Sequence, residues 1–216
     1  EATEAYEGAR SKIQDHFNVR KSCEIILTSG TTHSINLVAH GFRELLNDQD
    51  EIIISGLEHH SNIVPWQMMA EKNGAKIKVI PLKENGQLNM KSFDKLLNKN
   101  TKLVFVNHVS NALGTINPIK YIIEKAHKHN AVVLVDGAQA SAHFKTDLQE
   151  LNVDFYTTSA HKLCGPTGIG MLFGKEDWLN KLPPYQGGGE MISDVTFEKT
   201  SYAELPQKFE AGTPNV

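Results

Sequence analysis

The chain reads Val-Asp-Phe-Tyr-Thr-Thr-Ser-Ala-His-Lys-Leu-Cys-Gly-Pro-Thr-Gly-Ile-Gly-Met-Leu-Phe from residue 153 to residue 173. Two short apolar runs, 153–158 and 168–173, flank a polar stretch that contains glycine and proline, 159–166. Apolar runs of this length, bounded by turn residues, are typical of buried strands. No helical pattern separates the two runs, so we expect one of these strands to lie antiparallel to its neighbours.

Upstream of this stretch, short apolar runs alternate with helical patterns. The expected strands are 24–28, 51–55, 76–80, 102–107, 131–135, 154–158 and 168–173. The expected helices are an N-terminal one, in which Tyr6, Ala9, Ile13 and Phe17 recur at helical spacing, and 32–46, 62–72, 90–97 and 119–129. Unbroken apolar strands separated by helices indicate a parallel sheet with both faces covered. The sequence therefore predicts an α/β fold: a three-layer, mostly parallel seven-stranded sheet with helices on both faces.

Composition limits the possible functions. The chain has 216 residues, is 40% hydrophobic and carries a formal net charge of -3, which does not favour nucleic acid as a partner. No apolar run approaches the length needed to cross a membrane. The first residues lack the basic and apolar regions of a signal peptide, and two cysteines cannot form a disulfide framework. We expect a cytoplasmic setting.

The segment 183–216 differs from the rest of the chain. It contains Pro183-Pro184 and Gly187-Gly188-Gly189 and has little apolar periodicity, which is typical of loops. We therefore divide the chain into a core, 1–182, and a loop-rich segment, 183–216, which we expect to lead into a further domain beyond this chain.

Polar residues follow five of the expected strands. In an open parallel sheet, ligands bind at the carboxyl ends of the strands, so these residues are candidates for one site. In strand order they are Thr31 and Thr32, then His59, then the stretch 107–111 with Asn111, then Asp136 and Gln139, and last Ser159, His161 and Lys162. Taken singly, each is better explained as a helix cap or turn residue, but five such groups together are hard to explain in that way.

Lys162 and Asp136 together indicate a specific chemistry. A loop lysine can bond covalently to an aldehyde, and an acid at a strand end can keep a ring nitrogen protonated; pyridoxal phosphate (PLP) needs both. Thr31 and Thr32 open an expected helix, where backbone N–H groups can bind a phosphate. Lys162 alone would be taken for one of many surface lysines, and it is the combination that favours a PLP site.

Metal and hydrolase chemistry are disfavoured. His127 and His129 lie two residues apart on a helix and face different directions, so they do not make a zinc site. The Gly-x-Ser-x-Gly turn that a serine hydrolase would usually show is absent from the sequence. We expect no metal.

Six stretches of this chain resemble the class V aminotransferase-like branch of the fold-type I PLP enzymes, and within it the SufS-type cysteine desulfurases, a group that includes selenocysteine lyases. The stretches are TSGTTHSINLVA (28–39), EHHSNIVPWQ (58–67), HVSNALGT (108–115), VDGAQA (135–140), SAHKLCGPTGIG (159–170) and FEAGTPN (209–215). The resemblance covers nearly the whole chain, and it implies the fold of a PLP-dependent transferase large domain.

The resemblance also implies residue roles. Lys162 would hold PLP covalently, Asp136 would pair with the ring nitrogen, and His59 would stack on the ring. Gln139 and Asn111 would lie near the phenolic oxygen. The residues implied for the phosphate are Thr31, Thr32, Ser159 and His161, together with Thr213 acting on the neighbouring subunit of a homodimer.

An enzyme of the resembled group takes sulfur from L-cysteine, leaving L-alanine and an enzyme persulfide, and hands the sulfur to an acceptor protein for iron–sulfur cluster assembly. Its nucleophilic cysteine and substrate-binding arginine lie in a C-terminal domain, and neither Cys23 nor Cys164 matches that cysteine. We therefore expect this chain alone to be inactive. The alternatives are a selenocysteine lyase acting on L-selenocysteine, another class V enzyme, or a catalytically silent scaffold or dimerisation domain.

Overall fold

Seven strands form one sheet in the order β1-β7-β6-β5-β4-β2-β3 in a computed structural model that describes residues 1–214. Neighbours among β2 to β6 are parallel, whereas β7 is antiparallel to both β1 and β6. The predicted antiparallel strand is therefore confirmed. Asn215 of the motif FEAGTPN and Val216, the end of the predicted loop-rich segment, lie outside the described residues. The strands are β1 (Ile25–Thr28), β2 (Glu51–Ser55), β3 (Lys76–Ile80), β4 (Thr101–Asn107), β5 (Val132–Asp136), β6 (Phe155–Ser159) and β7 (Gly170–Gly174).

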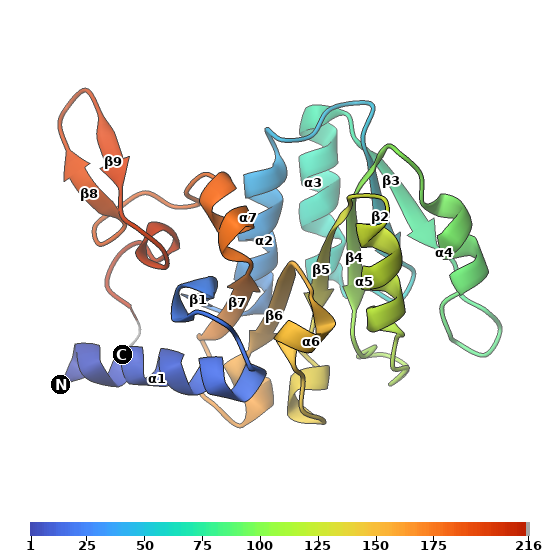
Figure 1. The fold of residues 1–216 in the computed structure, drawn as a ribbon, viewed down its shortest axis with the longest axis horizontal. Helices are drawn as coiled ribbons and strands as arrows, with labels where there is room; N and C mark the ends of the chain where they lie inside the picture. Colours follow the sequence, from blue (N-terminus) through green and yellow to red (C-terminus); the bar gives the residue numbers. More distant parts are fainter. Residues whose placement is uncertain (215–216) are drawn as a thin grey trace.

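Helices cover both faces of the sheet, as predicted, and give the molecule three layers (Figure 1). One face packs against α1 (Ala2–Phe17), α4 (Met90–Leu96), α5 (Ile119–His127) and α6 (Leu148–Leu151). The other packs against α2 (Thr31–Phe42), α3 (Val64–Asn73) and α7 (Glu176–Lys181).

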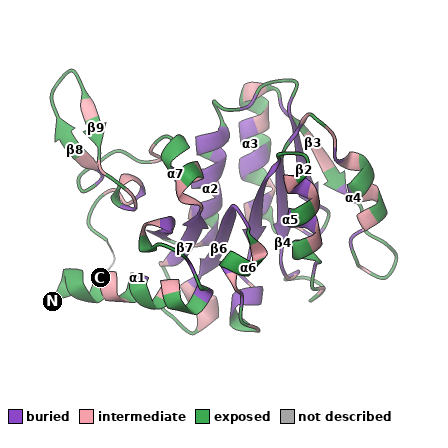
Figure 2. Ribbon diagram, viewed as in Figure 1, coloured by how far each residue is buried: buried purple, intermediate pink, exposed green. Residues whose placement is uncertain are grey.

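The central strands contribute side chains alternately to the two cores. On β4, Val104 and Val106 belong to the first core, while Leu103 and Phe105 belong to the second. Figure 2 shows these strands as buried along most of their length. Both faces of each strand are apolar because both are covered, which is why the runs in the sequence are unbroken.

Some elements differ from the prediction. α2 ends at Phe42 rather than at residue 46, although Leu46 still reaches the second core. The short helices α6 and α7 were not predicted, because they are too short to show a helical repeat. Within residues 1–214, no helix combines the length and the apolar character that a membrane span requires.

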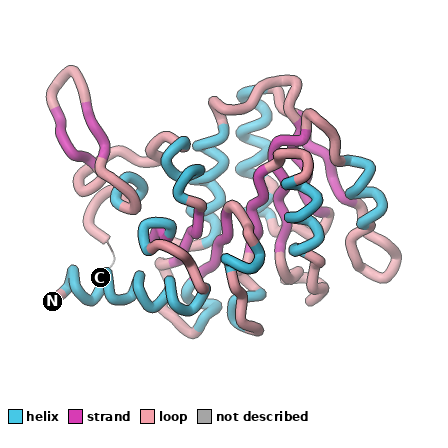
Figure 3. The backbone as a smooth tube through the Cα atoms, viewed as in Figure 1, coloured by secondary structure: helices cyan, strands magenta, loops and turns pink. Residues whose placement is uncertain are grey.

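A hairpin lies within the segment for which only loops were expected. β8 (Ile192–Val195) and β9 (Thr200–Tyr202) pair antiparallel and stand apart from the main sheet (Figure 3). Most of their side chains are exposed, so the apolar–polar alternation that normally identifies a strand is missing.

Candidate cofactor site

One cavity of about 270 Å³ lies at the carboxyl ends of β2, β4, β5 and β6, beside the start of α2. All the predicted site residues except Thr213 line it, although they come from five separate parts of the chain. These residues are Thr31, Thr32, His59, Asn111, Asp136, Gln139, Ser159, His161 and Lys162.

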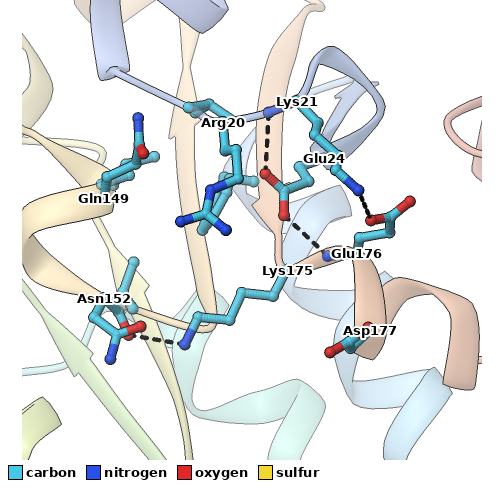
Figure 4. Close-up of a pocket in the computed structure, with 12 residues that line it drawn as sticks. Arg20, Lys21, Glu24, Gln149, Asn152, Lys175, Glu176 and Asp177 are labelled. Carbon is cyan, nitrogen blue, oxygen red and sulfur yellow. Dashed lines mark hydrogen bonds and ion pairs between the residues drawn. The ribbon is translucent and has the colours of Figure 1, made fainter.

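A polar cavity of similar size lies at the opposite end of the sheet (Figure 4). Its lining includes Lys21, Glu176 and Lys175, but these charges already have protein partners. Lys21 pairs with Glu176, and Lys175 Nζ donates to the Asn152 carbonyl at 3.0 Å and to Asp154 Oδ1 at 2.8 Å. No predicted site residue lies there, so the carboxyl-end cavity is the better candidate.

The start of α2 is held against the end of β6. Thr31 N donates to Ser159 Oγ at 2.9 Å, and the two hydroxyl oxygens are also 2.9 Å apart. Gly30, just before the helix, has φ 141°, and a Cβ there would lie 3.2 Å from Ser159 Oγ. Thr31 and Thr32 open α2 and line the cavity. The first N–H groups of a helix have no helical acceptor, which makes such a helix start a suitable place for a phosphate.

Asp136 is the acid of the site. It is only 6% exposed, and its Oδ1 accepts a hydrogen bond from Ala138 N at 2.9 Å. Burial raises the pKa of Asp136, an effect that this hydrogen bond and the electrostatic interactions with Lys162 and His59 oppose. Among the described residues none donates to Oδ2, so a cationic ring nitrogen on that side would supply the missing partner.

Gly137 is a functional position that the sequence reasoning missed. A Cβ there would lie 2.0 Å from Tyr156 Cζ, so the phenol ring occupies the space of the side chain. Ser141 Oγ donates to the Gly137 carbonyl at 2.8 Å and lies 3.4 Å from the Tyr156 hydroxyl. The bare backbone lets the chain turn directly after Asp136. The signal in the sequence was an Asp-Gly pair following an apolar run.

His59 begins the 3₁₀ turn η2 (His60–Asn62) and caps it with its own side chain. Its Nδ1 accepts from Ser61 N at 3.2 Å and lies 2.9 Å from Ser61 Oγ. A backbone N–H can only donate, so in the neutral ring the proton is on Nε2. The ring is thus held in one orientation at the edge of the cavity.

Lys162 lies on the 3₁₀ turn η4 (Ala160–Leu163), directly after β6. Two backbone bonds close the loop: Ala160 N to the Ile169 carbonyl at 3.0 Å and Gly165 N to the Ala160 carbonyl at 2.8 Å. Cys164 ends the turn with φ 61°. Within the part of the chain that the structure describes, no carboxylate forms an ion pair with Lys162. Its amine is therefore available to a ligand.

Two predicted positions behave differently. Thr213 lines another cavity, with Ser29, His33 and Gln186 among its neighbours. Within the stretch 107–111, which was expected to offer an amide, Asn107 is committed to the protein: its Nδ2 donates to the Leu57 carbonyl at 2.7 Å. Asn111 is the amide of that stretch that remains exposed at the cavity. Over residues 1–214, no group of three or more His, Cys, Asp or Glu side chains could hold a metal ion.

Comparison with known proteins identifies the family of this chain. A family model described as "Aminotransferase class-V" matches residues 1–216. A protein of Halalkalibacterium halodurans named "Probable cysteine desulfurase" is 50% identical over 216 residues, a match that covers 100% of this chain and 53% of that protein. The structure of the Escherichia coli cysteine desulfurase CsdA superposes with a TM-score of 0.96 at 42% identity, covering 99% of this chain and 54% of that one.

A more distant structure includes a cofactor. It is a C-DES variant with glycine covalently linked to its PLP cofactor, with a TM-score of 0.85 and 26% identity, covering 94% of this chain and 54% of that one. The chain spans about half the length of the relatives that it matches. Because the family model matches along the whole sequence, the chain belongs to the aminotransferase class-V family.

Proposed function

We propose that this chain binds pyridoxal phosphate in the carboxyl-end cavity and holds it covalently through Lys162. The observation that carries the proposal is the meeting of Lys162 and the buried Asp136 in one cavity, beside His59 and the start of α2. A free amine, a desolvated carboxylate and a helix N-terminus fit the aldehyde, the ring nitrogen and the phosphate of PLP.

Each predicted site residue has a role in this proposal. Asp136 Oδ2 would accept a hydrogen bond from the protonated ring nitrogen, and the His59 imidazole would stack on the ring. Gln139 and Asn111 would hold the phenolic oxygen. The residues that would hold the phosphate are Thr31, Thr32, Ser159 and His161, with Thr213 serving the site of the second subunit in a homodimer.

PLP, when bound, supplies an electron sink for a carbanion at the substrate α-carbon. With the cofactor bound, the amine of Lys162 would serve as the base that takes the α-proton of the substrate. Asp136 stays ionised and thereby keeps the ring nitrogen protonated. The buried position of Asp136 makes this pairing strong, because water does not screen it.

The whole protein is proposed to be a SufS-type cysteine desulfurase that acts on L-cysteine and passes sulfur to an acceptor protein for iron–sulfur cluster assembly in the cytoplasm. The names of the relatives support the substrate. Residues 1–182 form the cofactor-binding core in this proposal, and 183–216 connect it to a further domain. L-selenocysteine would fit the same chemistry. Turnover of L-cysteine and of L-selenocysteine by the full-length protein distinguishes a desulfurase from a selenocysteine lyase.

Borohydride reduction of the full-length protein, followed by peptide mapping, tests the proposal. The expected result is a pyridoxyl group on Lys162 and its loss in Lys162→Ala. A label on another lysine would contradict the assignment of Lys162. A protein without the visible absorbance of bound PLP would instead support a silent scaffold.

Asp136→Ala tests the acid. We expect the cofactor still to attach, while exchange of the substrate α-proton slows about a thousandfold, which corresponds to about 4 kcal/mol. Deuterium exchange into L-cysteine or L-alanine measures this rate, and exchange at the wild-type rate would count against the assigned role.

A further inference from the structure

Glu58, next to His59 in the chain, binds three different parts of the fold. Its Oε1 accepts from Ser55 Oγ at the end of β2 and from Asn107 N at the end of β4, the latter at 2.8 Å. Its Oε2 accepts from Asn62 Nδ2 in η2 at 2.7 Å. One carboxyl group therefore links the His59 loop to the ends of two neighbouring strands.

The orientation of Asn62 is fixed from its other side. The indole N–H of Trp66 donates to Asn62 Oδ1 at 2.9 Å, and an indole N–H can only donate. Trp66 is itself fully buried and stacks on Phe105 of β4, with ring centroids 3.5 Å apart and an interplanar angle of 7°. Asn62 can therefore offer Glu58 only its NH2 group.

Both oxygens of Glu58 must then act as acceptors. Asn62 Nδ2 and the Asn107 N–H, one on each oxygen, have no lone pair to offer in return. Burial raises the pKa of Glu58 to about 8. When the group is protonated, Ser55 Oγ is the only one of these partners that can accept its proton. A glutamine at this position would turn an NH2 group towards another donor in either rotamer.

The bonds around Glu58 lie on both sides of His59. Before it, the Leu57 carbonyl accepts from Asn107 Nδ2 at 2.7 Å; after it, Asn62 N donates to the His59 carbonyl at 2.8 Å. The imidazole is exposed at the cavity, so its position depends on the loop that carries it.

We propose that Glu58 is a positioning residue, which ties the loop carrying His59 to the carboxyl end of β4 and so fixes the imidazole at the cofactor cavity. The proposal rests on the proposed function in one respect, the stacking of His59 on PLP. A shift of about 1 Å in such a group is enough to impair a site of this kind.

Glu58→Gln in the full-length protein is the test, with Glu51→Gln as the matched control. Glu51 is a buried acid at the opposite end of the same strand, β2, where it pairs with Lys78 at 2.7 Å and accepts from Asn98 at 2.6 Å. Its replacement should lower stability without reaching the site. Ser55→Ala removes one donor to Glu58, together with the acceptor of Leu57 N, and serves as a milder variant if Glu58→Gln does not fold.

Three measurements separate positioning from general damage. In the cofactor-free protein, the ¹H–¹³C signal of the His59 ring, assigned with His59→Ala, should shift in Glu58→Gln and less in Ser55→Ala. In the loaded protein, the PLP Kd should rise about tenfold, and the circular dichroism of the bound cofactor should change. Glu51→Gln should leave all three at wild-type values.

The outcomes are distinct. An unchanged His59 signal in Glu58→Gln or, failing that, in Ser55→Ala would overturn the positioning role, whatever happens to PLP binding. The same shift in Glu51→Gln would overturn it as well, because it would mark a general loss of structure. A wild-type protein that does not bind PLP would overturn the proposed function, while the His59 signal would still decide the role of Glu58.

Discussion

Gly137 shows how a single missing side chain shapes the site. The Tyr156 ring lies against the backbone at this position, and the turn behind it provides the N–H of Ala138 for Asp136. Any Cβ at this position must displace either the ring or the turn. The acid therefore depends on its glycine neighbour for both its place and its hydrogen bond.

Gly137→Ala should destabilise the full-length protein by about 1–3 kcal/mol, the usual range for overpacking a well-filled core, and should weaken PLP binding. Gly8→Ala is the control, because a Cβ at Gly8, within α1, would meet nothing within 4 Å and should stabilise the helix slightly. Thermal unfolding and PLP titration measure both effects. Equal stability of the two variants would show that the Tyr156 ring moves aside at little cost in free energy.

His108 predicts a loss of stability in acid. It is 8% exposed and packs edge-on against Phe144, and among residues 1–214 its Nδ1 has no partner. Burial lowers the pKa of His108 to about 4. An unfolded histidine gains its proton near pH 6.5, so between about pH 6.5 and pH 4 only the unfolded chain is protonated at this site. The free energy of unfolding therefore decreases as the pH is lowered through this range.

The expected size of this effect is at most about 3 kcal/mol between pH 6.5 and pH 4. His108→Phe keeps a ring in the same contact but cannot titrate. The difference in unfolding free energy between wild type and variant should therefore move in favour of the variant as the pH falls. A difference independent of pH would mean that His108 gains its proton as readily in the folded protein as in the unfolded chain.

At the scale of elements, Asp154 bonds to three parts of the fold at the end of the sheet opposite the cavity. Its Oδ2 accepts from Val133 N of β5 and lies near His127 Nε2 of α5, both at 2.8 Å; its Oδ1 accepts from Lys175, just before α7. Burial alone would raise the pKa of Asp154, but the hydrogen bonds from His127 and Lys175 hold it below its usual value. The stability it provides is therefore present at neutral pH and is lost as the pH falls through the lowered pKa.

Asp154→Ala should lower the unfolding free energy by about 3 kcal/mol at pH 7, because Val133 N and His127 lose a buried partner. The effect should shrink below about pH 4, where the unfolded acid is protonated. PLP binding should change little, since the cavity lies at the other end of the strands. Chemical unfolding at both pH values measures the first two effects, and a large change in PLP affinity would contradict the third.

The sequence predicted elements well wherever burial imposed a pattern. β2 and β3 begin and end as expected, and the other strands of the sheet are displaced by one or two residues. The hairpin β8–β9 went unpredicted because its side chains face solvent and show no alternation. The grouping of the candidate site residues could be predicted for a related reason. The carboxyl ends of the strands converge in a parallel sheet, so polar residues that follow apolar runs could be assigned to one place. The roles of Gly137 and Glu58 could not be predicted, because their partners Tyr156 and Asn107 are distant in sequence and contact them only in the folded chain.

At the scale of the whole molecule, an ion pair ties the first helix to the last described segment. Arg10, 1% exposed, donates to Glu210 through both terminal nitrogens, at 2.8 and 2.9 Å, and also to the Ile25 carbonyl at 2.7 Å. Glu210 in turn accepts from Leu27 N at 2.6 Å. The planar guanidinium fits this arrangement, and an ammonium would satisfy only part of it.

Arg10→Lys should therefore lower stability by about 3 kcal/mol, even though the charge is kept. Lys120→Ala, which removes an exposed ion pair with Glu150, is the control and should change stability by less than about 1 kcal/mol. Thermal unfolding of the full-length variants compares them. Similar small losses of stability in Arg10→Lys and Lys120→Ala would mean that water replaces the hydrogen bonds between Arg10 and Glu210.

The pairing of β1 with β7 has a consequence for how the chain folds during synthesis. Among the described strands β1 pairs only with β7, and Ile25 lies opposite Phe173, so β1 finds its sheet neighbour only after β2 to β6 have been made. Until then α1 and β1 expose apolar side chains without a surface to cover them. Contacts between distant residues form slowly, so we expect α1 and β1 to need protection from aggregation during synthesis.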